Sequence, residues 1–290
     1  MKNIILITSA LIILVSTAKS ASPNEGVYLI VRADDIGSSH AANIACIESY
    51  QSGIARTVEV MVPCPWFLEA AAMLRENPGY DVGVHLTLTS EWSNVKWGPL
   101  TCSPSLVDSN GYFYPKQKNW EDENADDAFY NADPDIKEVE AELRAQIEMA
   151  LKYIPQVSHL SSHMGATRVD DELAALENRL AREYGLDIDL SALGVQYARW
   201  GSDSRDDVST REQKLIDMLE DLENGLYTIV EHPGLDTPEM QAQGHPGYEH
   251  VASHRDAVTK AFTSEKVKAV IQRRNIQLVS YKQAQDMFGK

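Results

Sequence analysis

The stretch VYLIVRADDIGSSH, residues 27–40, predicts a buried strand that ends in two adjacent carboxylates. Residues 27–31 are apolar throughout, as in a strand that is covered on both faces. Asp34 and Asp35 follow where this strand should end. Like charges a few ångströms apart repel and resist joint ionisation, so such a pair needs a cation, a shared proton or solvent around it.

The rest of the chain alternates short apolar runs with helical patterns. Next along the chain come AANIACIESYQSG (41–53, helical), TVEVMVP (57–63, apolar), WFLEAAAMLRENPG (66–79, helical) and VGVHLTLT (82–89, apolar). Further helices are expected at about 135–153, 170–184, 209–224 and 252–272, and strands near 157–162, 186–190, 227–232 and 276–281. This alternation predicts βαβ units and a parallel sheet in a single α/β domain. About seven strands favour a (β/α) barrel, although periodicity alone leaves a doubly wound sheet open.

Residues 90–134 interrupt this alternation. The segment is rich in Trp, Pro, Asn, Asp and Tyr and has no sustained periodicity. A loop of this length inside a compact domain is usually a lid, a binding loop or a disordered insertion. Its aromatic residues argue against disorder and serve either as platforms for sugar rings or as packing residues: Trp92, Trp97, Tyr112, Phe113, Tyr114 and Trp120.

The first twenty residues, MKNIILITSALIILVSTAKS, predict export. They combine an early Lys2, an apolar run over 4–15 and small residues before a cleavage point. We therefore expect a signal peptide at 1–20, a mature domain at 21–290 and a secreted or periplasmic location. The run is short for a membrane span, so stable membrane insertion is not expected, although an uncleaved anchor remains open.

The charge of the chain argues against nucleic acid as a partner. The formal net charge is −17, and removal of residues 1–20 takes Lys2 and Lys19 but no acidic residue, which leaves −19. Phosphate binding depends on clusters of Lys and Arg, and the sequence has none. The three cysteines, Cys46, Cys64 and Cys102, permit at most one disulfide and have no metal-knuckle spacing, so we interpret them as small buried apolar residues.

Polar side chains recur at the expected strand ends, which in α/β barrels carry the active site. They are Asp34, Asp35, His85, Thr87, Thr89, His159, His163 and His232. A single histidine in a strand is more often a hydrogen-bonded core residue than a ligand. One carboxylate with two imidazoles, however, is a common open metal site that leaves room for water and substrate.

Spacing alone leaves the third ligand and the order of the two aspartates open. In SHLSSH (158–163) either His159 or His163 could be the ligand, with the other as a supporting or packing residue. A bound dication would neutralise one aspartate, while the other accepts a proton from the attacking water. Asp35 as ligand and Asp34 as base is one assignment of the two.

Six stretches resemble the YdjC-like, or ChbG-type, carbohydrate deacetylases. They are ADDIG (33–37) with Asn43, GIARTVEVMV (53–62), VGVHLTLT (82–89), SHLSSH (158–163), EHPG (231–234) and residues 253–284. The resemblance covers about 27–285 in order. It implies a distorted (β/α) barrel that removes acetyl groups from N-acetylated amino sugars in oligosaccharides with a divalent metal ion, often assigned as Mg²⁺. An acetylated oligosaccharide is then the expected substrate, and a homodimer is compatible with it.

The resemblance also implies a role for each matching residue. Asp35, His85 and His163 match the metal ligands, Asp34 the catalytic base, and His232 the acid that protonates the leaving amine. A ligand set of one Asp and two His suits Zn²⁺, Mn²⁺ or Fe²⁺ at least as well as Mg²⁺.

The chain departs from the family pattern at several positions. Ile36 stands where the family has Phe, and Ser161 stands where the HxDSH motif has Asp, which removes an expected partner of the metal ligands. MGATR (164–168) replaces further histidines at the rim. The family's basic residue after the next helix has no clear counterpart, with Arg168 and Arg199 as candidates.

Two other functions remain open. One is a metal hydrolase of the same fold that cleaves another amide or an ester. The other is an exported, noncatalytic sugar-binding protein. The joint presence of Asp34, Asp35, His85, His163 and His232 argues against the second, because binding alone requires neither an acid nor a base.

Overall fold

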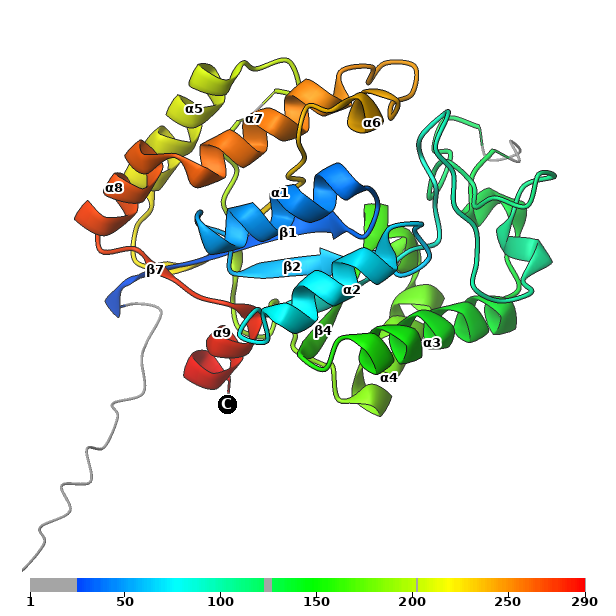
Figure 1. The fold of residues 1–290 in the computed structure, drawn as a ribbon. Helices are drawn as coiled ribbons and strands as arrows, with labels where there is room; N and C mark the ends of the chain where they lie inside the picture. The colour runs from blue at the N-terminus through cyan, green and yellow to red at the C-terminus, as the bar shows by residue number, and fades with distance from the viewer. Residues whose placement is uncertain (1–24, 123–126, 202, 290) are drawn as a thin grey trace, which may run out of the picture.

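A parallel sheet of seven strands stands at the centre of the molecule (Figure 1). The strands are β1 (Val27–Ile36), β2 (Thr57–Val60), β3 (Val82–Leu86), β4 (Val157–Ser162), β5 (Gln196–Tyr197), β6 (Gly225–Glu231) and β7 (Gln277–Leu278). Their order is β4-β3-β2-β1-β6-β5, β7 pairs with β1, and every pair is parallel. The sheet curls into a half-barrel whose end strands are β4 and β5.

Helices surround this sheet in the computed structural model, which describes residues 25–122, 127–201 and 203–289. They are α1 (His40–Gln51), α2 (Phe67–Glu76), α3 (Ile136–Tyr153), α4 (Asp171–Tyr184), α5 (Val208–Asp221), α6 (Pro238–Gln241), α7 (Val251–Thr263), α8 (Glu265–Arg273) and α9 (Tyr281–Phe288), with short 3₁₀ turns η2 (Pro104–Leu106), η3 (Tyr130–Ala132) and η4 (His163–Arg168). The signal peptide predicted at 1–20 lies outside the described residues. None of the helices in the described ranges combines the length and apolar character needed to cross a membrane.

Strand β1 is buried on both faces and divides the core. Leu29 and Val31 belong to the large hydrophobic cluster, while Tyr28 and Ile30 belong to a second cluster with Val279. A strand that packs on both sides must be apolar at consecutive positions, which explains the unbroken run at 27–31.

The barrel of about seven parallel strands and the single α/β domain are confirmed, but two predicted elements are wrong. Residues 186–190 form no strand, and β5 comes later, at Gln196–Tyr197. The helix expected at 252–272 is two helices that meet at Ser264. The Ser264 side chain accepts hydrogen bonds from the backbone N–H groups of Lys266 and Val267, so it caps α8 and ends the continuity.

The long segment 90–134 is largely anchored by its aromatic residues. Trp92, Trp97 and Phe113 are buried, which fits a packing role, whereas Tyr112 and Trp120 are exposed. The indole N–H of Trp97 donates to the backbone carbonyl of Thr89, 2.8 Å away and three residues after the end of β3. The segment is therefore fixed to the sheet beside the polar strand ends.

Candidate metal centre

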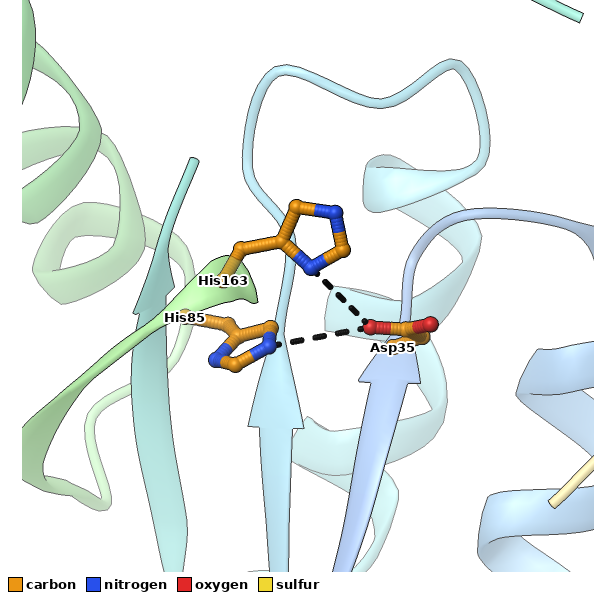
Figure 2. A group of neighbouring side chains, drawn as sticks. All are labelled: Asp35, His85 and His163. Atoms are coloured by element: carbon orange, nitrogen blue, oxygen red, sulfur yellow. Dashed lines mark ion pairs between the residues drawn. The ribbon is translucent and has the colours of Figure 1, made fainter. Parts of the chain in front are cut away.

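Asp35, His85 and His163 converge at the carboxyl ends of β1, β3 and β4 (Figure 2). One ligand atom from each lies within 4.8 Å of the others. Asp35 Oδ1 is 3.7 Å from His85 Nε2 and 3.5 Å from His163 Nδ1. Two donors that bind one ion at about 2.1 Å stand roughly 3.0–3.5 Å apart, so these separations need only small adjustments.

A bulge in β1 brings both aspartates to the same site. Successive side chains of a regular strand point to opposite faces. The pairing of β1 with β2 shifts register between Ala33 and Ile36, and Asp35 takes a left-handed conformation with φ of 73°. As a result, His85 Nε2 lies 3.6 Å from Asp34 Oδ2 as well as 3.7 Å from Asp35 Oδ1. Aspartate tolerates left-handed φ better than most residues, and bulges often re-aim a side chain at a functional site.

Among the described residues, two buried atoms of this triad have no hydrogen-bond partner, Asp35 Oδ1 and His163 Nδ1, which form an ion pair with each other at 3.5 Å. Both face the point that a shared ion would occupy (Figure 2). Unpaired buried polar atoms are costly and rare in folded proteins, and a bound cation satisfies both. The residues present therefore fit a divalent metal ion.

The His163 imidazole is held from its outer side by Glu91, which sequence reasoning missed. His163 Nε2 lies 3.1 Å from Glu91 Oε2, and both side chains are nearly inaccessible. Burial alone lowers the pKa of His163, but Glu91 and Asp35 together raise it to about 10. His85 differs, because burial, the neighbouring His163 and Arg32 lower its pKa well below the usual range. Without an ion, His163 is therefore the protonated member of the pair.

Each aspartate also has its own arginine. Arg32 Nε and Nη2 each donate to one oxygen of Asp34 at 2.6 Å, and Arg255 Nη2 donates to Asp35 Oδ2 at 2.7 Å. Burial raises the pKa of Asp35, yet the charges of Arg255, His232 and His163 hold it well below its usual range. A cation is thus not the only compensation for two adjacent carboxylates, since a guanidinium balances each of them.

Arg255 contacts a residue of the triad, whereas the two sequence candidates are exposed. The Arg168 side chain is 60% exposed and pairs with Glu177, while Arg199 is exposed. Arg255 lies in SHRD (253–256), a stretch that the resemblance included without assigning a role to it. Its separation of 220 residues from Asp35 leaves no local spacing signal.

The structure separates the two histidines of SHLSSH (158–163). His163 joins the triad, whereas His159 is fully buried below it, where its Nε2 lies 2.9 Å from Glu59 Oε1 and its ring stacks on Tyr281 at 3.7 Å. Burial raises the pKa of Glu59, but His159 and Arg32 outweigh this and lower it to about 2. His159 is therefore the supporting member of the pair. A charged residue inside the apolar run TVEVMVP (57–63) was the available signal for Glu59.

The remaining predicted residues lie around this centre. His232 follows β6 directly and is near enough for its charge to act on Asp35. The Thr87 hydroxyl donates to the backbone carbonyl of His85, and the Thr89 hydroxyl donates to the Met164 sulfur at 3.4 Å. In the described part of the chain the cysteines are free, with Cys46 and Cys64 buried as expected but Cys102 exposed.

Comparisons with known proteins agree with this architecture. The family model described as YdjC-like protein matches residues 28–273. A carbohydrate deacetylase of Listeria monocytogenes serotype 4a is 35% identical over 162 residues, which cover 55% of this chain and 59% of the relative. The Thermus thermophilus carbohydrate deacetylase is 34% identical over 235 residues, with 74% of this chain and 80% of the relative covered. The match to the Listeria protein thus spans about three fifths of that relative's length.

A solved structure shows the same fold. A protein of Enterococcus faecalis, provisionally described as a cellobiose-phosphate cleavage protein, superimposes with a TM-score of 0.70 at 26% identity. The superposition covers 89% of this chain and 98% of that protein. With a family model that spans most of the chain and a relative matched over four fifths of its length, the chain belongs to the YdjC-like family.

Proposed function

We propose that this protein is a metal-dependent carbohydrate deacetylase, which hydrolyses the acetyl amide of N-acetylated amino sugars in oligosaccharides. The observation that carries the proposal is the buried triad of Asp35, His85 and His163, in which Asp35 Oδ1 and His163 Nδ1 face each other without a hydrogen bond among the described residues. The names of the relatives supply the substrate class, because two matched proteins are described as carbohydrate deacetylases.

The proposed ligands are Asp35, His85 and His163. A divalent ion held there would polarise the acetyl carbonyl and activate the attacking water. Mg²⁺ is the ion that the family resemblance implies, while two imidazoles with one carboxylate also suit Zn²⁺. The proposal therefore names no particular ion, and the experiment below compares Mg²⁺ with Zn²⁺.

Asp34 is the proposed general base. Its Oδ2 lies 3.6 Å from His85 Nε2. The Asp34 carboxylate therefore stands beside the proposed ligand atoms, although Asp34 is not itself one of the three ligands. Arg32 donates to both oxygens, but each carboxylate oxygen has two lone pairs and can accept a further proton. Arg32 thus orients the carboxylate as it takes the proton from the attacking water.

His232 is the proposed general acid. It lies on the neighbouring strand end, after β6, and is only partly buried, so it can approach a substrate that enters from solvent. It would donate its proton to the amine as the carbon–nitrogen bond breaks. General acid and base catalysis of this kind is typically worth about 10² to 10⁴ in rate.

Acetate release tests the proposal most directly. Purified residues 21–290 would be incubated with N-acetylglucosamine oligomers and with O-acetylated glycans, with and without a chelator. We expect acetate from the N-acetylated oligomers, its loss with chelator, and its return when Mg²⁺ or Zn²⁺ is restored. Release from the O-acetylated glycans alone would assign another hydrolase activity, and glycan binding without any acetate would assign a binding protein.

The export prediction is a separate proposal. It depends on the composition of residues 1–20. Fractionation of cells that express the full chain, with N-terminal sequencing of the product, tests it. A mature protein that begins near residue 21 outside the cytoplasm supports export, and an intact N-terminus in the cytoplasm contradicts it.

A further inference from the structure

A chain of three hydrogen-bonded side chains runs beneath the triad from Glu59 to His85. His85 Nδ1 lies 2.8 Å from Ser161 Oγ, and the Ser161 hydroxyl donates to Glu59 Oε2. All three side chains are buried: Glu59 and His85 are 0% and 2% exposed, and Ser161 is 5% exposed. They come from three adjacent strands, β2, β4 and β3, which fix their backbones relative to one another.

The direction of these hydrogen bonds determines which nitrogen of His85 carries the proton. A serine hydroxyl has one proton, and a carboxylate can only accept. Since the Ser161 proton points to Glu59, the Ser161 oxygen must accept from His85 Nδ1. A neutral imidazole has a single N–H group, so His85 Nε2 keeps its lone pair, and this is the atom that faces Asp35.

The sheet leaves room for this arrangement at Gly83. A side-chain carbon at position 83 would collide with the Glu59 carboxylate and with the His159 ring. Glu59 also accepts from His159 on its other oxygen and lies near the Thr57 hydroxyl, 3.3 Å away. The carboxylate is therefore held in one position by its neighbours, as a residue that must orient a ligand should be.

We propose that Glu59, acting through Ser161, is the positioning residue that fixes the tautomer and orientation of His85 for metal binding. This inference rests on the metal site of the proposed function. It also gives a physical account of Ser161, which stands where the family motif has Asp. The carboxylate that orients the histidine comes from β2 in this chain, and the serine hydroxyl spans the gap.

Zn²⁺ affinity tests the proposal without reference to activity. Dissociation constants would be measured by competition with a chromophoric chelator for the wild type, Glu59→Gln, Ser161→Ala and the double variant Glu59→Gln/Ser161→Asp. We expect each single variant to bind Zn²⁺ about 10- to 100-fold more weakly, as is typical when a partner of a metal-bound histidine is lost. The double variant should recover most of the affinity, because the carboxylate introduced by Ser161→Asp accepts directly from His85 Nδ1.

Glu177→Gln is the matched control. Glu177 is a buried carboxylate that also accepts from a hydroxyl, that of Thr167, but within the described residues it makes no hydrogen bond or ion pair with the triad. Its Zn²⁺ affinity should equal that of the wild type. Equal affinity in Glu59→Gln and the wild type would overturn the proposal, as would the absence of recovery in the double variant.

The His85 tautomer gives a second, independent readout. Long-range ¹H–¹⁵N NMR of the metal-free wild type should show His85 protonated at Nδ1, and protonation at Nε2 would overturn the proposal even if the variants fail to fold. A wild type that binds neither Zn²⁺ nor Mg²⁺ would instead refute the metal site of the proposed function. The tautomer measurement still decides the role of Glu59 in that case.

Discussion

At the scale of single residues, the protonation of His163 should make binding at the proposed metal site depend on pH. Glu91 and Asp35 raise its pKa to about 10, so in the metal-free protein it carries a proton at neutral pH. A metal ligand must release that proton before it can bind. The proton on His163 stabilises the metal-free fold fully below pH 6.5, the ordinary pKa of histidine. This stabilisation is lost as the pH rises towards the folded-state pKa of about 10.

Metal binding at pH 7 should therefore release about one proton per ion. Isothermal titration calorimetry in buffers of different ionisation enthalpy measures this number directly. Affinity should also rise with pH, since fewer protons then compete. His163→Ala removes the competing proton along with the ligand, so its weak residual binding should lose most of this pH dependence. Wild-type binding heats that do not depend on the buffer would contradict the protonated state.

Two alanine variants distinguish the proposed general acid, His232, from the proposed metal ligand His85. His232→Ala should lower kcat by about 10² to 10⁴, the usual range for a lost general acid, and leave metal content unchanged. His85→Ala should lose both metal and activity, because it removes a proposed ligand. Metal analysis of the purified variants beside acetate-release kinetics distinguishes the two. A His232 variant that purifies without metal would move His232 into the ligand set.

At the scale of secondary structure elements, β3 depends on the missing side chain at Gly83. Gly83→Ala places a methyl group against the Glu59 carboxylate and the His159 ring. We expect a loss of about 1–3 kcal/mol in the free energy of unfolding, as for other overpacked cores, together with weaker Zn²⁺ binding. Chemical denaturation and metal titration measure the two effects.

Gly79→Ala is the control for this substitution, because a methyl group there meets no atom of the described residues within 4 Å. It should leave both the stability and the Zn²⁺ affinity close to those of the wild type. Equal effects of the two substitutions would mean that the pair of Glu59 and His159 tolerates displacement.

The elements show where sequence reasoning succeeds and where it stops. The first strand and its polar end were predictable because an apolar run is followed by two carboxylates in VYLIVRADD (27–35). The absence of a strand at 186–190 was not predictable, because alternating apolar and acidic residues suit an irregular surface segment as well as a strand. The bulge that aims both Asp34 and Asp35 at His85 is a property of strand pairing, which no local pattern encodes.

The candidate site divides in the same way. Asp35, His85 and His163 could be named because motif and strand end coincide at each. Glu91 and Arg255 act on the site only through the tertiary fold, which brings a loop residue and a helix residue to it. From the sequence, Ser161 indicated the loss of a carboxylate partner for the metal ligands. The sequence could not show that the Ser161 hydroxyl reaches Glu59 on another strand.

At the scale of the whole molecule, ion binding should stabilise the fold. An ion that binds only the folded state adds about 2.7 kcal/mol when its concentration is 100 times the dissociation constant. For a chain of this size that corresponds to a rise in Tm of about 5 °C. Differential scanning calorimetry with Zn²⁺ and with chelator measures the shift. An Asp35→Asn variant should show none of it, and an unchanged wild-type Tm would contradict binding to the folded state.

Because of the two arginine–aspartate pairs, folding of the chain should not require a bound metal ion. Arg32 and Arg255 balance Asp34 and Asp35 before any ion arrives, so the carboxylates can be buried in the newly made protein without one. Small zinc modules behave in the opposite way, since they unfold when the metal is withdrawn. If the proposed metal site is correct, the chain can fold before an ion binds, and the ions available to the folded protein then determine which of them it holds.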